Sequence, residues 1–543
     1  MAEFDPYTWI FGLAVVVGFI ESYGIGANDL ANAFGTSVSA KALKYWQAIC
    51  VAAVFEFLGA ILLGANNTDT MKAGVADPKA FAARPEILMY GMLCVMIASG
   101  FWDIFSCTLE LQVSTTHTTA GALIGMALAS YGSSAVIWSK SSDTFPYVKG
   151  VSQLFIGWGT SPVLAMTFAS ILFFCVRTFV MRSKHAYQRA LYVMPLAVWL
   201  TTFVVVFSII QTGNKNKTWA EVSNGKACWI AVSIACGLGI LSGLAFIPVM
   251  RKHIQLLEAQ RAADDAAAVE AGKDGTALGS EGGSDDAKLE KTPSRLMAAV
   301  THVKESKTGK AISRNKFFKW LTYSINYDMH SVLKEDAANY NVRASRIWAN
   351  AEQFDWRAET VFKYIQVFSA CVMSFAHGAN DVANAMGPFS AVYYIWQNSE
   401  VPGSKVPVPT WILAYGGVGI VVGLATYGYK IMGLYGVKSV MMSNCRGFSI
   451  ELATALTVIF AARFGIPVST SHIAVFSAVA VGCFEGIRGV NWIMVLQTIM
   501  AMFLTLGVAM GCSAGLTAFG IYSPMKNLQD ATGYPGGQYQ ISE

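Results

Sequence analysis

An acidic octapeptide occurs twice, as Gly26–Ala33 and as Gly378–Ala385, with seven of eight positions identical. In a helix its Asp and Asn side chains share one face, because residues three and four positions apart are neighbours. An ionised Asp inside a bilayer costs about 3 kcal/mol or more unless it is paired, hydrated or bound to a cation. Asp and Asn oxygens are hard ligands that suit sodium. The doubled octapeptide therefore favours a cation site over a purely structural hydrogen-bond cluster.

A hydroxyl-rich motif follows each octapeptide, as Ser114–Thr116 and as Ser469–Ser471, and Pro467 precedes the second copy. Each copy lies where one apolar stretch ends and another begins, which predicts a helix N-cap. Free backbone N–H groups, the helix dipole and the hydroxyls together suit an oxyanion. Capping alone would account for one such motif, but two copies coupled to two acidic motifs favour an anion site. We interpret the neighbouring His117 and His472 as structural rather than as proton-coupling groups.

The anion must tolerate two nearby carboxylates. Phosphate fits because its P–OH can donate to a carboxylate while its other oxygens accept from hydroxyl and N–H groups. Sulfate carries no such proton at neutral pH, so an acidic residue would repel it. The residues therefore favour phosphate, with sulfate as an alternative.

The elements that must position these motifs are long apolar stretches. Of the 543 residues, 54% are hydrophobic and only 13% charged, which indicates a membrane protein. A membrane span needs about 20 mostly apolar residues, and the chain offers about twelve such stretches. We predict spans at residues 9–30, 43–64, 89–109, 117–131, 151–176, 191–211, 228–249, 361–386, 410–432, 447–465, 469–485 and 490–517.

The two motif pairs keep their order and nearly their spacing, since Gly26 and Gly378 are 352 residues apart and Val113 and Val468 are 355 apart. The octapeptides fall in the first and eighth spans, and an odd number of crossings reverses the second copy. The sequence therefore predicts an all-α polytopic protein with two inverted repeats and interrupted helices. Such repeats enclose one midplane substrate site in transporters.

The chain divides into a membrane half at 1–249, a charged loop at 250–360, a second membrane half at 361–520 and a tail at 521–543. We expect the loop to begin with a disordered linker, residues 258–291, because this stretch is rich in Ala, Gly, Asp and Ser. Its later part fits either helices at the membrane surface or a loosely ordered loop.

Basic residues after the fifth span, such as Arg177 and Arg182, place that side and the long loop in the cytoplasm. The net charge of +5, from 39 Lys and Arg against 34 Asp and Glu, gives no basis for a nucleic-acid partner.

In the octapeptides and in Arg446–Leu452 and Pro467–His472, the sequence resembles the inorganic phosphate transporter family, also called PiT or solute carrier family 20. The stretch Glu359–Gln366 is similar to the eukaryotic branch. The resemblance implies a dimeric twelve-helix symporter of the plasma membrane. It would import phosphate with sodium, with no enzymatic activity and no cofactor besides the transported sodium.

Carried over by motif, the resemblance implies a phosphate site and a sodium or coupling site that share residues. The phosphate site comprises Asn28, Asp29, Ser114, Thr115, Thr116, Asn380, Asp381, Ser469, Thr470 and Ser471. The sodium or coupling site comprises Asp29, Asn32, Asp381, Asn384, Glu56 and Glu451, with Gln112 as a further candidate ligand. Gln112 is a departure, because the family usually has proline at this position.

Three alternatives stand beside sodium–phosphate symport. The first is a proton-coupled phosphate carrier or a sulfate carrier. The second is a phosphate-sensing receptor or scaffold whose functional part is the loop at 250–360. The third, an intramembrane metallo-enzyme using His117, His472, Asp29 and Asp381, is disfavoured because the sequence has no HExxH or other recognised catalytic motif.

Overall fold

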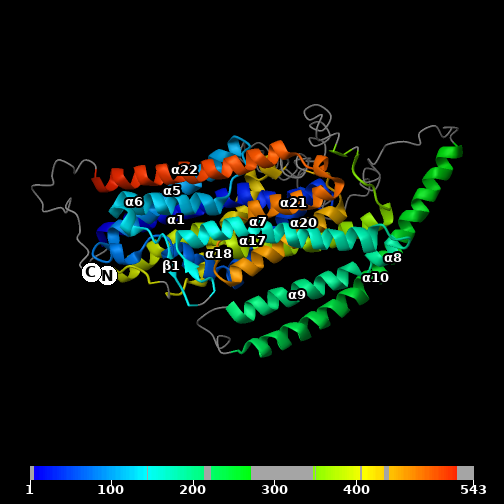
Figure 1. Cartoon of the computed structure of the whole chain (residues 1–543), viewed down its shortest axis with the longest axis horizontal. Helices are drawn as coiled ribbons and strands as arrows, with labels where there is room; N and C mark the ends of the chain where they lie inside the picture. The colour runs from blue at the N-terminus through cyan, green and yellow to red at the C-terminus, as the bar shows by residue number, and fades with distance from the viewer. Residues whose placement is uncertain are drawn as a thin grey trace, which may run out of the picture.

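The computed structural model describes residues 5–143, 145–212, 222–270, 347–348, 350–403, 406–432 and 440–522. These residues form an elongated helical bundle (Figure 1). Within them the one sheet is an antiparallel pair, β1 (Lys140–Ser141) with β2 (Val148–Lys149), in which Lys140 lies opposite Lys149. The all-α prediction is confirmed.

The helices of the first half are α1 (Thr8–Ile25), the π-helical η2 (Gly26–Leu30), α2 (Ala31–Ser39), α3 (Tyr45–Leu63), α4 (Ala65–Ala73), α5 (Pro85–Thr108), α6 (Thr115–Tyr131), α7 (Val151–Cys175), the π-helical η5 (Val176–Met181), α8 (Ala186–Ala190), α9 (Val193–Thr212) and α10 (Asn224–Glu270). Those of the second half are α17 (Trp356–Asn398), α18 (Thr410–Tyr427), α20 (Asn444–Arg463), α21 (Thr470–Gly482) and α22 (Trp492–Tyr522). Short 3-10 turns are η1 (Asp5–Tyr7), η3 (Pro78–Phe81), η4 (Gly132–Ala135), η6 (Cys483–Glu485) and η7 (Ile487–Gly489).

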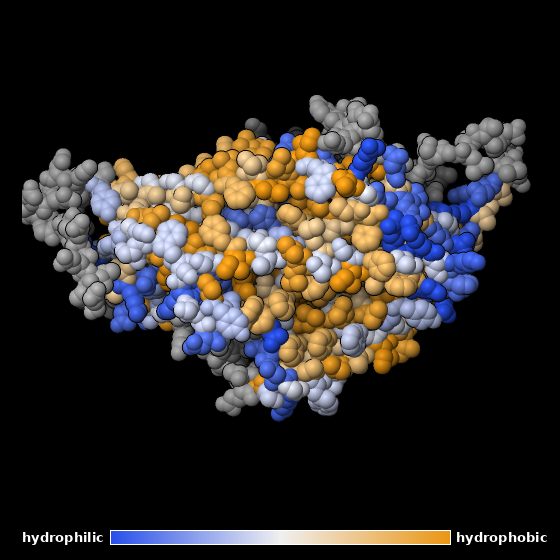
Figure 2. Space-filling model, viewed as in Figure 1, coloured by the Kyte–Doolittle hydropathy of each residue, from blue (hydrophilic) through white to orange (hydrophobic). Residues whose placement is uncertain are grey.

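The surface of the bundle is apolar around its middle. Figure 2 shows hydrophobic residues across the central band and hydrophilic residues gathered toward the end where Figure 1 places α8. Large apolar side chains such as Leu244 and Phe503 are 71% and 68% exposed, as expected for contact with lipid tails. Nine helices among the described residues are long and apolar enough to cross a membrane. The chain is a multi-pass membrane protein.

Four of the predicted spans form two helical hairpins whose tips contact each other. Helices α5 and α6 lie in the left half of Figure 1 and α20 and α21 in the right half. Bridges between Ala76 and Val136, and between Val440 and Val490, join the two ends of each hairpin. At about 1.5 Å per residue, α21 is about 20 Å long, less than the 30 Å of a hydrocarbon core. The predicted count of twelve crossings is therefore not confirmed.

The two hairpins lie in opposite halves of the bundle in Figure 1. The motifs at their tips are in contact, because Thr116 donates to the Val468 carbonyl at 3.1 Å and Ser471 to the Val113 carbonyl at 3.4 Å. The rings of His117 and His472, just beyond the tips, have centroids 4.7 Å apart. Replacing two crossings by a hairpin leaves an odd number of crossings between the octapeptides. The inverted relation of the repeats is therefore retained.

The octapeptides lie in helices that cross their neighbours closely. A Cβ added at Gly26 would overlap the carbonyl oxygen of Ile420 in α18, and one added at Gly378 would overlap that of Glu56 in α3. Only glycine fits at such backbone crossings. The small residues of the octapeptides therefore allow close helix contact in both repeats.

Helix α10 continues past residue 249 to Glu270, so the first part of the predicted disordered linker is helical. Glu258 forms a 3.2 Å ion pair with Arg357, and the guanidinium carbon of Arg261 lies 3.8 Å from the ring centroid of Trp356. These contacts fix α10 against the start of α17, which explains why the stretch is ordered. Residues 271–346, and all but the first two residues of the predicted tail, lie outside the described residues.

Candidate functional site

The hairpin tips end where a serine caps the following helix. Ser114 and Ser469 have extended backbones, with φ of −102° and −84°. Their hydroxyls accept hydrogen bonds from the backbone N–H groups of His117 and His472. The N-caps predicted from the hydroxyl motifs are therefore present in both repeats.

Two asparagines of the octapeptides hold these tips in place. Asn28 Nδ2 donates to the Leu111 carbonyl at 3.0 Å, and its Oδ1 accepts from the Val113 N–H at 3.1 Å. Asn380 makes both corresponding bonds to Val468, at 2.7 and 3.3 Å. Non-helical backbone deep in a membrane needs such partners. Both amides, predicted as phosphate ligands, are thus engaged with the tip backbones.

Asp29 accepts hydrogen bonds from both hairpins. Its Oδ2 accepts from the Thr115 hydroxyl at 2.9 Å, and its Oδ1 accepts from Ser471 at 2.5 Å and from Thr470 at 3.1 Å. The carboxylate is 1% exposed. The first octapeptide is therefore bound to the tip of its own repeat and to the tip of the other.

Asp381 mirrors this arrangement. Its Oδ1 accepts from Asn384 at 3.0 Å and from the Thr116 hydroxyl at 3.3 Å, and its Oδ2 lies 3.0 Å from Thr470 Oγ1. Thr470 therefore contacts both aspartates. The structure brings the two acids together with four of the six motif hydroxyls, those of Thr115, Thr116, Thr470 and Ser471. The other two predicted ligands, Ser114 and Ser469, use their hydroxyls as helix caps.

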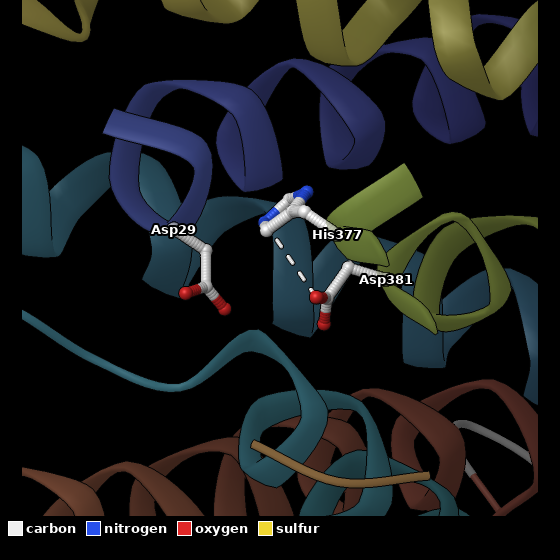
Figure 3. Close-up of side chains that lie close together, drawn as sticks. All are labelled: Asp29, His377 and Asp381. Carbon is white, nitrogen blue, oxygen red and sulfur yellow. Dashed lines mark ion pairs between the residues drawn. The ribbon is translucent and has the colours of Figure 1, made fainter. Parts of the chain in front are cut away.

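A histidine that the sequence interpretation did not assign completes the cluster. Figure 3 shows His377 beside Asp381 and across from Asp29, with the ion pair between His377 Nε2 and Asp381 Oδ2 dashed at 3.5 Å. The other ring nitrogen, Nδ1, lies 2.7 Å from Glu56 Oε1. His377 is four residues before Asp381, and this spacing on one helix face was the available signal.

The charges of the cluster favour a bound cation. Three buried carboxyl groups, Asp29, Asp381 and Glu56, surround one imidazole. One atom each from Asp29, His377 and Asp381 lies within 4.8 Å of the others. Even a protonated imidazole would leave excess negative charge where an isolated charge costs several kcal/mol, about 3 or more. Carboxylate and hydroxyl oxygens suit sodium better than a soft metal.

Glu451 lies in a second polar cluster. Its Oε1 accepts from Thr36 at 2.6 Å and Ser37 at 2.5 Å, both at the end of α2, and its Oε2 accepts from Ser369 at 2.5 Å. Gln366 Nε2 also donates to Oε1, at 3.1 Å. The sequence interpretation proposed Glu451 but missed these partners, although Gln366 and Ser369 are three residues apart in an apolar helix.

The remaining predicted residues differ in their surroundings. Gln112 is 6% exposed, and neither polar atom of its side chain has a hydrogen-bond partner within the described parts of the chain. The side chain of Asn32 lies outside the described residues. His117 stacks on Trp158 with centroids 3.7 Å apart, and its Nδ1 is 2.7 Å from Ser114 Oγ, which supports the structural interpretation.

Comparison with known proteins finds relatives that match nearly the whole chain. The profile of the phosphate transporter family matches residues 25–513. The phosphate-repressible phosphate permease pho-4 of Neurospora crassa is 28% identical over 94% of this chain and 97% of its own. Inorganic phosphate transporter 2-1, chloroplastic, of Arabidopsis thaliana is 30% identical over 91% of this chain and 69% of its own. A solved structure described as the sodium-dependent phosphate transporter has the same fold, with a TM-score of 0.66, 24% identity and coverage of 94% and 98% of the two chains.

Proposed function

Because this chain belongs to the phosphate transporter family, we propose that it is a symporter that carries inorganic phosphate into the cell together with sodium. Phosphate transport, rather than an enzymatic reaction, is the activity of the family. Sodium coupling, the alternating-access mechanism, a location in the plasma membrane and a homodimeric state are the parts of this proposal that go further.

The observation that carries the proposal is the pair of aspartates joined by hydroxyls from two opposed hairpins. Thr470 contacts both Asp29 and Asp381, at 3.1 and 3.0 Å. The hydroxyls can turn from the carboxylates to a phosphate, whose own P–OH can then donate to an aspartate. Sodium ions would offset the combined negative charge. Each ligand would therefore raise the affinity for the other.

The opposed hairpins suggest how access alternates. One tip approaches the cluster from each end of the bundle, and each tip is bonded to the aspartate of the other repeat. Release of one tip at a time would open the cluster to one side only, as expected for inverted repeats. Bound ligands would shift the balance between these states by their different affinity for each.

The Glu451 cluster supports a further sodium site. Four side chains from α2 and α17 direct hydroxyl or amide groups to one fully buried carboxylate. The same hydroxyl oxygens can coordinate a cation. In the sodium-coupled proposal, Glu451→Gln should raise the sodium concentration for half-maximal uptake about tenfold. Glu258→Gln, at an exposed ion pair, is the matched control.

The central test is uptake of radiolabelled phosphate into proteoliposomes with sodium or potassium outside at fixed pH. Sodium-dependent uptake that is lost in Asp29→Asn and in Asp381→Asn would support the proposal. Equal uptake in potassium, driven by an imposed proton gradient, would favour proton coupling. Competition by sulfate would instead favour the sulfate alternative.

A phosphate-sensing scaffold remains the second candidate, and the long loop distinguishes it from a transporter. Deleting residues 271–291 should leave uptake intact if the membrane bundle carries the function. A sensor centred on the loop would lose its output while phosphate binding persists.

A further inference from the structure

A cavity of about 250 Å³ lies apart from the aspartate cluster, between the end of α2, the segment before α17 and the start of α20. Ser39 lines it from α2, Trp348 from the segment before α17, and Asn444 and Arg446 from α20. Ser39 is only two residues beyond Ser37, whose hydroxyl donates to Glu451. Arg446 lies five residues before Glu451 in α20, so the cavity is about 7–8 Å along that helix from the predicted sodium cluster, on the side where α17 begins.

Four buried polar atoms, each in a residue that lines this cavity, have no hydrogen-bond partner among the described residues. They are Ser39 Oγ, Trp348 Nε1, Asn444 Oδ1 and Arg446 Nε. Ser39 and Arg446 are 8% and 1% exposed. Buried polar groups without partners are rare and costly, so four around one cavity indicate a missing ligand.

The chemistry of these atoms indicates an acceptor ligand. The Arg446 and Trp348 nitrogens can only donate, and the Ser39 hydroxyl can donate. The Asn444 carboxamide can present its nitrogen after rotation, because the two ends of an amide are assigned from the surrounding hydrogen bonds. A ligand that accepts several hydrogen bonds and carries negative charge matches this set.

The acidic groups at the cavity are already engaged. Glu352 accepts from the side chains of Arg177 and Arg182, both at 2.7 Å. Partial burial raises the Glu352 pKa, but the hydrogen bonds and charges of these two arginines outweigh it and hold the pKa below its usual value. Glu359 accepts from the Cys445 N–H at 3.2 Å.

Two basic side chains line the cavity, as many as the acidic ones. Arg446 is paired with Glu485 at 2.6 Å and also donates to the Glu352 carbonyl at 2.9 Å. Lys41 lines the cavity, and its φ of 59° places a non-glycine residue in the left-handed region, directly after α2. Lys41 and Arg446 line the cavity together with Glu352 and Glu359, and Arg177 and Arg182, which lie outside the lining, pair with Glu352. The start of α20 adds the positive end of a helix dipole.

We propose that this cavity is a second oxyanion site, which binds inorganic phosphate independently of sodium and separately from the aspartate cluster. Because the cavity lies about one and a half helical turns from Glu451, phosphate would be held there on the side of the long loop. Phosphate held there can delay the return of an empty carrier, so the site links transport to the phosphate concentration on that side.

The test is equilibrium binding of radiolabelled inorganic phosphate to the purified full-length protein, in potassium and in sodium. We expect one site per chain in potassium and two in sodium. Ser39→Ala and Trp348→Phe should each weaken binding in potassium about tenfold, since each removes one donor to a charged ligand. Trp138→Phe is the matched control, because its indole N–H is exposed and already bonded to Ser133. Thermal unfolding would verify that the variants are folded.

The outcomes separate this inference from the transport proposal. Asp29→Asn should remove only the sodium-dependent site. Loss of both sites in Asp29→Asn, no binding in potassium, or equal binding in wild type and in both cavity variants would overturn the second site. If binding in potassium persists and depends on Ser39 and Trp348 while sodium adds nothing, sodium coupling fails and the second site stands.

Discussion

The two octapeptides are nearly identical in sequence but differ in winding and in partners. Gly26–Leu30 of the first copy forms a π-helical segment, whereas the second copy lies within the continuous α17. Asp29 is held by hydroxyls from both tips, while Asp381 also pairs with His377, which joins it to Glu56. The residue at the position of His377 in the first copy is Ile25. The two copies thus have nearly the same sequence but differ in backbone winding and in the groups that contact their aspartates.

The two aspartates therefore have different surroundings, although both belong to the proposed ligand site. The first depends on groups that can rotate toward a ligand, and π-helical segments are frequent at such sites. The second aspartate, Asp381, contacts the His377 imidazole, which in turn contacts the Glu56 carboxyl group. We expect both to be required, but for the second copy to be the more sensitive to changes outside the octapeptide.

The largest effect should come from the aspartates themselves. Asp29→Asn and Asp381→Asn should each lower sodium-driven phosphate uptake by about 100-fold or more, equivalent to about 2.7 kcal/mol. Each removes a buried charge that several donors face. Initial uptake rates per folded protein would check this. Retention of more than a tenth of the activity in either variant would show that the copies are not both needed.

Both copies should respond alike to crowding at their glycines. Gly26→Ala and Gly378→Ala place a Cβ against a neighbouring backbone, which cannot move away as a side chain can. Each should destabilise the protein by about 1–3 kcal/mol or more. Gly12→Ala in α1 is the control, since its added Cβ meets nothing within 4 Å. Thermal unfolding temperatures equal to that of the control would contradict the close crossings.

The His377 imidazole lies between Glu56 and Asp381, so we expect substitutions in this group to have non-additive effects on uptake. His377→Ile makes the second copy resemble the first and should reduce uptake about tenfold, because it leaves two buried carboxyl groups without their partner. Glu56→Gln should have a similar effect. The double variant should be no worse than the poorer single variant, as a double-mutant cycle would measure. If the reductions in uptake of the two single variants multiply in the double variant, the two residues act independently.

The smallest expected effects come from the threonine hydroxyls, which differ in the number of aspartates that they contact. Thr470 contacts both aspartates, whereas Thr115 contacts only Asp29 of the two. The single Thr470 proton can be donated to either aspartate, so Thr470→Val should raise the KM for phosphate about tenfold, and Thr115→Val, whose hydroxyl contacts one aspartate, about threefold. Equal effects would indicate that the tips contribute symmetrically.

Much of the site could be predicted because polar residues are conspicuous in apolar stretches. Asp29, Asp381 and the hydroxyl motifs stand out for this reason, and the N-caps at Ser114 and Ser469 follow from their surroundings. The hairpins could not be predicted, because the 24 mostly apolar residues of α5 satisfy the length of a membrane span. Whether such a helix crosses or turns back depends on what it packs against.

The partners of Glu451 could not be predicted from the sequence for a different reason. A hydroxyl in an apolar helix usually bonds to a carbonyl of the preceding turn, so residues such as Thr36 and Ser37 carry no distinctive signal. The role of His377 depends on Glu56, which lies 321 residues away in the sequence. Contacts of this kind require the tertiary structure.

The bond between Ser471 and Asp29 joins residues 442 positions apart. At about 5–20 residues per second, a ribosome needs roughly 20–90 s to add that stretch. During this time Asp29 has already left the ribosome while one of its partners does not yet exist. The first repeat must therefore enter the membrane with an incomplete acidic centre, and the last hairpin to be inserted completes it. The protein is thus vulnerable to misfolding until its final membrane segments have been inserted.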